Sequence, residues 1–507
     1  MDGQMKRFLY AITLALACIP ATKMSASDLD SARTERARMW NDTRRAGWTN
    51  PALYGTAFRK THSALFFQSD WGHEKIPVVM EKGSGQLSGA LKAVSYIRLS
   101  DRTTVWGAAS YTTGETRNIT WNSTTDYHLL APYVLADTVG GNTCSERYCF
   151  SGGYSARMGQ WTAAGELLFR AEQEYRKRDP RMRGIVSDLT LRVGAARDWG
   201  LERWALAAEA NIYKQNNDVV FHQEAGGVTE YQMTGLGTYN ARFTASATSM
   251  YYKGGDIGLQ IDAHPISAAG WFGTVALSAH HYERISNEYN SLPLTTLYVA
   301  RVGLTAGWKR EGACCLAVFG HFDHTRKSGD EHVAGNAVGG EYPVLADLTM
   351  YKHRLTDASL HAVYGEQNRI CWYVRAAVGY RNSRERYAYP LRKMDDRRLY
   401  GRLDTQWLIP VTRRFTFECV LGSSYSANID KAITMPYANM EASFIRKVNA
   451  TYRQLTANCT TINGKLRGDY TLAARRLTVY CELVGSQWFS NVQNNGQQVG
   501  LTLGITY

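Results

Sequence analysis

The end of the chain alternates strictly between apolar and small polar residues. From Val499 to Tyr507, every second position is apolar or aromatic, and the positions between them are glycine or threonine. Successive side chains point to opposite faces only in a β-strand. The pattern therefore predicts a strand with one apolar face and one small, polar face.

The same alternation recurs along most of the chain. The segments are 161–172, 189–195, 204–213, 298–308, 372–381, 399–409, 415–422 and 476–483. With their flanking residues most run to about 9–13 residues, the length of a tilted strand that crosses a bilayer, whereas soluble sandwich strands are nearer five or six. Lipid leaves no backbone polar group unpaired, so such strands must close on themselves. We predict an all-β fold, a transmembrane antiparallel up-and-down barrel of about 18 strands, within a range of about 14 to 20.

The connections support a barrel but leave one ambiguity. Short links at 100–102, 366–369 and 410–413 alternate with long ones, the longest expected at 113–147 and 324–356. Short turns on one side and long loops on the other are typical of barrels in the outer membrane. Between 205 and 275 the parity fails by one strand, so either 239–251 and 256–264 form one irregular crossing or the strand count is wrong there.

The N-terminal part differs from the rest and suggests three regions. Lys6 and Arg7 precede a short apolar stretch and then small residues, the layout of a secretory signal peptide at 1–26. Residues 27–60 form the second region, a periplasmic or plug segment, and residues 61–507 the barrel. Leu29, Ala32, Arg36, Met39 and Trp40 suit an amphipathic helix that Pro51 would stop. A plug in the lumen and a poorly ordered tail both fit this segment.

Composition excludes several classes of protein. The 507 residues are 44% hydrophobic and 20% charged, which rules out a disordered chain. No uncharged apolar run reaches the ~18 residues of a membrane-spanning helix. Cys144 and Cys149 lie in an expected loop, and we predict that a disulfide between them could hold this loop in place. No cysteine or histidine set has zinc-like spacing, so we expect no metal and no cofactor.

Charged residues on the predicted lumen faces are the best candidates for a site. They could form a charged constriction, as rings of fixed charge do in pores, or they could pair with one another and seal the lumen. The candidates are Arg170, Arg192, Arg301, Arg375, Arg381, Arg402, Asp404, Glu418, Arg476 and Glu482. The net charge of +13 favours anionic solutes, or lipopolysaccharide phosphates if the charge lies on outer loops. Outer-membrane lipid, lipopolysaccharide and a surface lipoprotein are the expected partners, and the basic runs are no nucleic-acid signature.

Several short motifs resemble a known class. Residues 40–42, 48–53, 133–141, 151–154 and 500–507 together look like an outer-membrane β-barrel of the Bacteroidota type, from a family of unknown function. This resemblance implies the outer membrane of a Gram-negative cell. Asn50-Pro51-Ala52-Leu53 also resembles the N-terminal hatch motif of long-chain fatty-acid transporters, although the expected strand number exceeds what that family uses. There the motif implies a lumen plug, a role carried over to Asn50, Pro51 and Ala52.

Catalytic chemistry is sparse in the sequence. The best candidates are His280-His281-Tyr282-Glu283 and His321-Phe322-Asp323-His324, in which His321 and Asp323 share one strand face. No serine elbow or phosphate loop accompanies them. We therefore expect no enzyme but a passive or ligand-gated channel for a solute. The alternatives are a non-conducting structural, assembly or secretion-associated barrel, and an outer-membrane hydrolase that uses the His321 region.

Overall fold

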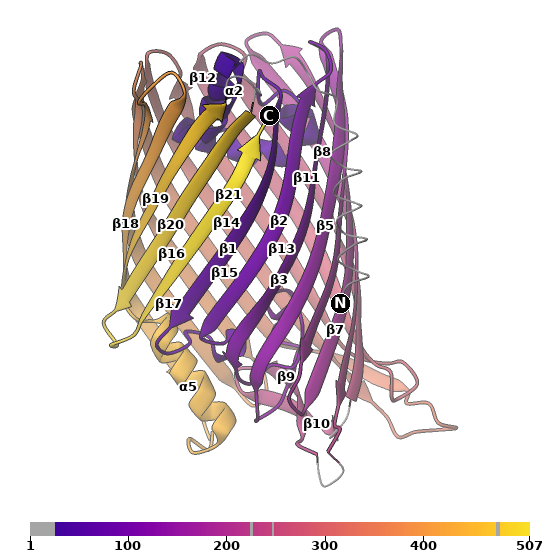
Figure 1. The fold of residues 1–507 in the computed structure, drawn as a ribbon. Coiled ribbons are helices and arrows are strands. Elements are labelled where there is room, and N and C mark those ends of the chain that lie inside the picture. The colour runs from indigo at the N-terminus through magenta and orange to yellow at the C-terminus, as the bar shows by residue number, and fades with distance from the viewer. Residues whose placement is uncertain (1–25, 224–226, 246–247, 473–476) are drawn as a thin grey trace.

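The computed structural model describes residues 26–223, 227–245, 248–472 and 477–507, and in these residues eighteen strands form one closed antiparallel barrel (Figure 1). It closes because β1 (His62–Glu74) pairs with both β2 (Gly85–Arg98) and β21 (Asn495–Thr506). The other barrel strands are β3 (Thr103–Ile119), β5 (Gly141–Met158), β6 (Trp161–Arg176), β7 (Arg181–Trp199), β8 (Glu202–Val220), β11 (Thr248–Pro265), β12 (Ala269–Ser286), β13 (Leu292–Arg310), β14 (Cys314–Ala334), β15 (Val344–Gln367), β16 (Cys371–Tyr387), β17 (Arg392–Pro410), β18 (Phe415–Thr434), β19 (Cys459–Leu472) and β20 (Leu477–Ser490). The predicted fold class is confirmed.

The apolar positions of the alternation lie on the outside of the barrel. Leu191, Val193 and Leu206 each expose 50% of their surface, although they are large and apolar. The polar positions beside them face inward and pair with one another. This inside-out distribution is that of a barrel whose wall faces acyl chains, because only lipid makes an apolar exterior of this extent favourable. None of the helices described is long and apolar enough to cross a membrane.

The two ends of the barrel have different connections. One end, uppermost in Figure 1, holds the last residue of β21 and the N-terminal helix. The described turns at this end, such as 159–160 and 200–201, have only a few residues. The other end carries every long loop. It also has short connections at 177–180, 388–391 and 491–494, so the alternation of short and long links is not strict.

The long loops are shorter than expected because the strands continue past the membrane. β15 has 24 residues, roughly 80 Å of strand at about 3.3 Å per residue, whereas a tilted strand needs only roughly 40 Å to cross the ~30 Å hydrocarbon core. β14 and β15 therefore cover much of the region 324–356 that the sequence suggested was loop.

The ambiguity between 205 and 275 is resolved by a side sheet. β9 (Glu230–Gly235) pairs with both β10 (Thr238–Ala245) and the short β4 (Leu135–Ala136) in a three-stranded sheet that is not part of the barrel wall. Only β11 crosses between β8 and β12. The estimate of about 18 strands is thereby confirmed, with one crossing in this region.

The N-terminal segment lies in the mouth of the barrel at the short-turn end (Figure 1). We call residues 26–58 the plug. They form α2 (Ala26–Ala37), two 3₁₀ turns, η1 (Met39–Thr43) and η2 (Arg45–Thr49), and the short α3 (Pro51–Tyr54). Pro51 does not end a helix, as the sequence suggested, but begins one, because proline suits the first helical turn. The predicted signal peptide falls on residues that, apart from Ala26, lie outside the described part of the chain.

Inward-folded loops occupy the opposite end, and we call them the cap. The cap comprises residues 120–140 with α4 (Tyr127–Leu130) and β4, the β9–β10 hairpin, and α5 (Ser443–Leu455). A further 3₁₀ turn, η3 (Met80–Lys82), lies in the β1–β2 loop. Leu130, Leu135, Met233 and Val448 from the cap join one apolar core with wall residues from β7 to β16.

Candidate functional site

The lumen between plug and cap is lined by the polar faces of the strands. All the described members of the predicted constriction set face it, whereas Arg476 lies outside the described residues. They do not form one ring. The structure divides them into groups that hold the plug, groups that hold the cap, and pairs within the wall.

Two groups fasten the plug. Arg375 on β16 binds Asp42 of η1 and also Asp404, with Nη2 2.7 Å from Asp404 Oδ2. Arg402 donates to the same Asp404 oxygen at 2.7 Å. Asp404 is almost fully buried and so depends on these two arginines, because an unpaired buried carboxylate is costly.

Glu418 and Glu482 belong to the second group that reaches the plug. Arg33 Nη2 lies 2.8 Å from Asp469 Oδ2 and 3.7 Å from Glu418 Oε2, and all three side chains are buried. Lys465 and Arg467 connect Glu418 and Glu482 along the wall. The plug therefore inserts a positive charge into an acidic part of the lumen wall.

The hatch-like motif is a contact between plug and wall. Asn50 Nδ2 donates to Asp262 Oδ2 at 3.1 Å, and Asn50 Oδ1 accepts from the Ala52 N–H at 3.0 Å, which caps α3. A Cβ at Gly194 would lie only 2.4 Å from Asn50 Oδ1. Glycine on β7 thus permits the close approach, and Asn50, Pro51 and Ala52 are buried there.

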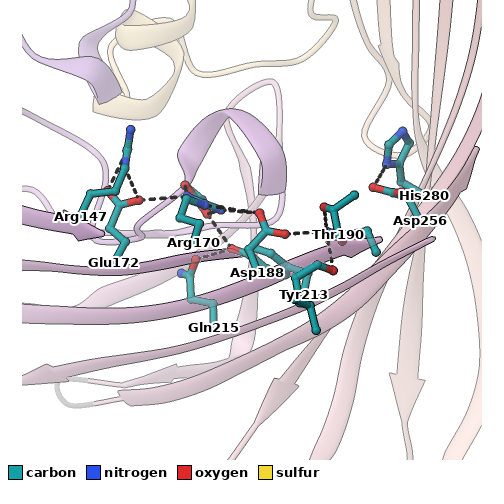
Figure 2. Close-up of polar contacts among 12 residues, drawn as sticks. Arg147, Arg170, Glu172, Asp188, Thr190, Tyr213, Gln215, Asp256 and His280 are labelled. Atoms are coloured by element: carbon teal, nitrogen blue, oxygen red, sulfur yellow. Dashed lines mark hydrogen bonds and ion pairs between the residues drawn. The ribbon is translucent and has the colours of Figure 1, made fainter. Parts of the chain in front are cut away.

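Arg170 fastens the cap (Figure 2). Its guanidinium binds both oxygens of Asp126, at 2.9 and 2.7 Å, where Asp126 belongs to the loop that folds into the lumen. The same group contacts Glu172 at 2.9 Å and Asp188 at 3.1 Å. One cation on β6 therefore contacts three carboxylates and ties the loop to the wall.

Arg192 and Arg381 make pairs within the wall. Arg192 lies between Glu209 and Glu166, with Nη1 3.3 Å from Glu166 Oε2. Arg381 Nε lies 2.7 Å from Asp357 Oδ2. Both therefore have carboxylate partners, as the sealing interpretation expected.

Arg301 is the exception in the predicted set. It is exposed to the lumen and forms no ion pair with a carboxylate among the described residues. It borders a cavity of about 270 Å³ together with Glu209, Gln260 and Asp323. Among the described members of the set, Arg301 is the one side chain without an ion pair.

Buried charge also holds the cap itself. Arg176 Nη1 lies 2.6 Å from Asp137 Oδ2, and both side chains have no exposed surface. Lys447 of α5 pairs with Glu81 at 2.7 Å. Burial, reinforced by the nearby Asp137 carboxylate, raises the pKa of Glu230 in β9 well above its usual value.

The predicted disulfide between Cys144 and Cys149 is wrong. Both residues lie in β5, not in a loop, and both are free thiols. Five residues of strand span roughly 16 Å and place the two side chains on opposite faces, whereas a disulfide needs Cα atoms within about 7 Å.

The histidines proposed as catalytic do not come together in one site. His281 faces outward, and His280 faces the lumen, where Nδ1 lies 3.1 Å from Asp256 Oδ2 (Figure 2). His321 lies 3.5 Å from Asp323 and 2.9 Å from the Thr305 hydroxyl. Among the described residues, no group of three His, Cys, Asp or Glu side chains is arranged to hold a metal ion.

Sequence reasoning missed the partners that fasten plug and cap. Arg33, Asp42 and Asp126 were not singled out, because each lies in a segment without strand alternation. Their partners are distant in the sequence. In another contact between plug and wall, the Met39 N–H donates a hydrogen bond to Gln406 Oε1, 367 positions away. No local signal in the sequence identifies such pairs.

Several solved structures are similar to this chain. A mutant of the ferric enterobactin receptor PfeA from Pseudomonas aeruginosa is 9% identical, with 88% of this chain and 80% of that chain covered and a TM-score of 0.38. BauA, the ferric preacinetobactin receptor from Acinetobacter baumannii, is 8% identical over 88% and 80%, with a TM-score of 0.41. The copper transporter OprC is 7% identical over 88% and 81%, with a TM-score of 0.40. All three scores lie below 0.5, so the likeness does not extend to activity or ligand.

The search of curated proteins returned no match. A family model, in contrast, matches residues 51–507, which include every strand of the barrel and begin at the proline of the hatch-like motif. The chain therefore belongs to a family of unknown function, DUF6850.

Proposed function

We propose that this protein is a gated passage for a solute across the outer membrane, and that the plug is its gate. The observation that carries the proposal is the way the plug is held. Arg33, Asp42 and Asn50 each reach a polar partner on the lumen wall, namely Asp469, Arg375 and Asp262. These contacts come from three separate points along the plug.

Contacts of this kind can be exchanged for water or for a ligand. A hydrogen bond to a charged group contributes about 1.5–3 kcal/mol, because water competes for both partners. A solute that binds Arg375 or Asp469 offers the same interaction and can replace the plug. The apolar contacts of the plug are divided among three clusters: Met39 and Trp40 pack among wall residues of β12 to β17, Ala52 and Leu53 pack with Ala196 and Ala205, and Phe58 packs with Tyr96 and Trp106.

Cavities lie at both ends of the barrel. A cavity of about 550 Å³ lies beside the plug, bordered by Arg44, Arg203 and Lys309. A cavity of about 680 Å³ lies at the loop end, along β1, β2 and β21 and away from the apolar core of the cap. Movement of the plug would connect the first cavity with the lumen.

The proposed solute is anionic. Arg301, Lys92 and Lys327 face the lumen, and none of them forms an ion pair with a described carboxylate. Lys92 donates only to Gln68 Oε1, and Lys327 only to the Ala131 carbonyl. Unpaired cations in a confined lumen raise the local concentration of anions.

We also propose contacts outside the barrel. Lipopolysaccharide and outer-membrane lipid would surround the wall, and a surface lipoprotein would dock at the loop end. The projecting β14–β15 hairpin supports the second idea, because Val338 and Leu345 are 75% and 68% exposed there.

Conductance of the purified protein in planar bilayers tests the gate. We expect the native barrel to remain closed and the double variant Arg33→Gln with Asp42→Asn to open, because two of the plug's charged contacts with the wall are lost. Among the described residues, only the partly exposed pair of Arg44 with Glu311 then remains between plug and wall. The matched control is Arg397→Gln with Asp430→Asn, an exposed pair 3.0 Å apart in the wall that does not touch the plug. It should stay closed.

A plug variant that stays closed, although its heat-modifiable mobility on gels shows a folded barrel, would contradict the gate and favour a non-conducting structural barrel. The open variant should prefer anions in a salt gradient, and Arg301→Gln should reduce that preference. A cation preference would contradict the proposed solute class.

A further inference from the structure

A serine, a histidine and an aspartate form a hydrogen-bonded chain on the lumen wall. Ser278 Oγ lies 3.0 Å from His280 Nε2, and His280 Nδ1 lies 3.1 Å from Asp256 Oδ2. Ser278 and His280 are two residues apart on β12 and so share its inner face. Asp256 is the direct partner of His280 on β11, and Figure 2 shows this second contact.

These distances suit a nucleophile and its base. A serine hydroxyl becomes nucleophilic when a histidine nitrogen accepts its proton, and a carboxylate on the other ring nitrogen fixes the tautomer. Because Asp256 can accept only from an Nδ1–H, Nε2 is left to accept the proton of Ser278. Tyr282 stacks on the His280 ring at 6.5 Å between centroids and limits its rotation.

Free space lies in front of the serine. Ser278 borders the cavity of about 270 Å³, and the wall beside it carries Gly258 and Gly303. A Cβ at Gly258 would stand 3.9 Å from Ser278 Cβ. The two glycines therefore leave room beside the hydroxyl, and Thr49 of the plug closes the cavity on one side.

A cation stands where negative charge would develop. Arg301 on β13 is the direct cross-strand partner of Ser278, so the two inward side chains are neighbours. Among the described members of the predicted set, it is also the one without an ion pair. A guanidinium in that place stabilises the oxyanion of a tetrahedral intermediate.

We propose that Ser278, His280, Asp256 and Arg301 form a hydrolytic site for small carboxylic esters inside the barrel. Ser278 Oγ attacks the ester carbonyl carbon while its proton passes to His280 Nε2, and Arg301 stabilises the oxyanion. The intermediate then releases the alcohol, which takes the proton from Nε2. Water hydrolyses the acyl-serine by the same route and restores the hydroxyl. Asp256 is a positioning residue, because it acts through His280.

The barrel contains its own control for this site. On β15, Ser359 Oγ lies 2.9 Å from His361 Nε2, again two residues apart on the inner face. His361 stacks on Phe319, and among the described residues no carboxylate is hydrogen-bonded to its Nδ1. The serine–histidine pair is thus repeated without the third member.

A fluorophosphonate probe tests the site in the detergent-solubilised full chain, with peptide mapping to locate the modified serine. Access to the cavity rests on the proposed gate, so the native protein and the plug variant Arg33→Gln with Asp42→Asn are both treated. We expect modification at Ser278 and none at Ser359. Ser278→Ala should abolish it, and His280→Ala and Asp256→Asn should slow it by about 10²- to 10⁴-fold.

The same variants are assayed with p-nitrophenyl acetate. The Ser359→Ala control should hydrolyse it at the native rate, whereas Arg301→Gln should be slower and Arg301→Lys should recover part of the loss. Heat-modifiable gel mobility shows which variants remain folded, and the conservative Asp256→Asn keeps the test open if His280→Ala does not fold.

The two proposals fail separately. If the plug variant conducts but the probe does not modify Ser278, or modifies Ser359 equally, the hydrolytic site alone is overturned. A protein that never conducts but is modified at Ser278 overturns the gate and supports the site. If the protein neither conducts nor is modified at Ser278, the gate and the hydrolytic site are both overturned.

Discussion

The plug and the cap fill opposite ends of the same lumen, but they meet the wall through different groups. The plug meets it through charged and amide side chains, among them Arg33 and Asp42, and through apolar contacts that are divided among three clusters. The cap shares one continuous apolar core with strands from β7 to β16, which includes Leu135 and Met250. A fully buried ion pair between Arg176 of β6 and Asp137 of the cap also joins the cap to the wall.

This difference indicates which end of the barrel can move. Separation of the cap would expose a large and continuous apolar surface, which is costly in water. Separation of the plug exchanges polar contacts for hydration. The cap is therefore expected to be a fixed part of the barrel, and the plug its movable part.

The largest effect is expected from removal of the cap's buried cation. Arg176→Ala leaves Asp137 charged and without its partner, which should destabilise the cap by about 3–5 kcal/mol. Hydrogen exchange of residues 120–140 measures the loss. Arg381→Ala removes a more exposed partner of Asp357 and should have a much smaller effect. Equal effects would mean that the cap is not held from within.

The apolar core of the cap should be nearly as sensitive. Leu135 has no exposed surface, so Leu135→Ala should cost about 2–5 kcal/mol through lost burial and a cavity. Protease resistance of the β9–β10 hairpin, which pairs with β4, reports the change. Leu345→Ala on the exposed hairpin is the control and should leave resistance unchanged. An unaffected cap in Leu135→Ala would refute the shared core.

A smaller effect is expected at the plug. Asp42→Asn weakens one charged contact to Arg375, which keeps Asp404, so the plug should lose about 1.5–3 kcal/mol. Faster hydrogen exchange in residues 39–54, with the cap unchanged, is the expected result. Asp430→Asn, at an exposed pair, should not alter the plug. Destabilisation of cap and plug together would show that the two closures are one unit.

The smallest effect concerns pH. The pKa of Glu230 is raised in the folded cap, so its protonated form contributes stability at low pH. That contribution is lost as pH rises from the ordinary carboxyl pKa through the raised one. Native cap loops should become more protease-sensitive over that interval, and Glu230→Gln should flatten the response. An unchanged slope in the variant would assign the effect to another group.

The wall could be predicted from the sequence because its signal is local. Residues such as Val499 and Leu501 must face lipid, so the alternation is imposed residue by residue and survives without knowledge of the partner strand. The strand ends were less predictable, since beyond the membrane both faces meet water. The error at Cys144 and Cys149 has this origin, because the strand there continues past the apolar belt.

The site could be predicted only in part. The inward charges were identified from alternation, but their roles depend on segments that meet only in the folded barrel. Arg375 lies near Asp42, and Arg170 near Asp126, through closure of the barrel and folding of loops into it. Ser278 was missed because a single serine two positions before a histidine has no distinctive pattern, and its significance depends on Asp256 in the neighbouring strand.

The central claim is that the plug closes the lumen of a membrane-spanning barrel. Single-channel recording of the full chain beside a chain that lacks residues 27–58 tests it most directly. The account predicts a silent full-length protein and persistent, ion-conducting openings after truncation. Silence of both proteins, or equal conductance from both, would contradict it.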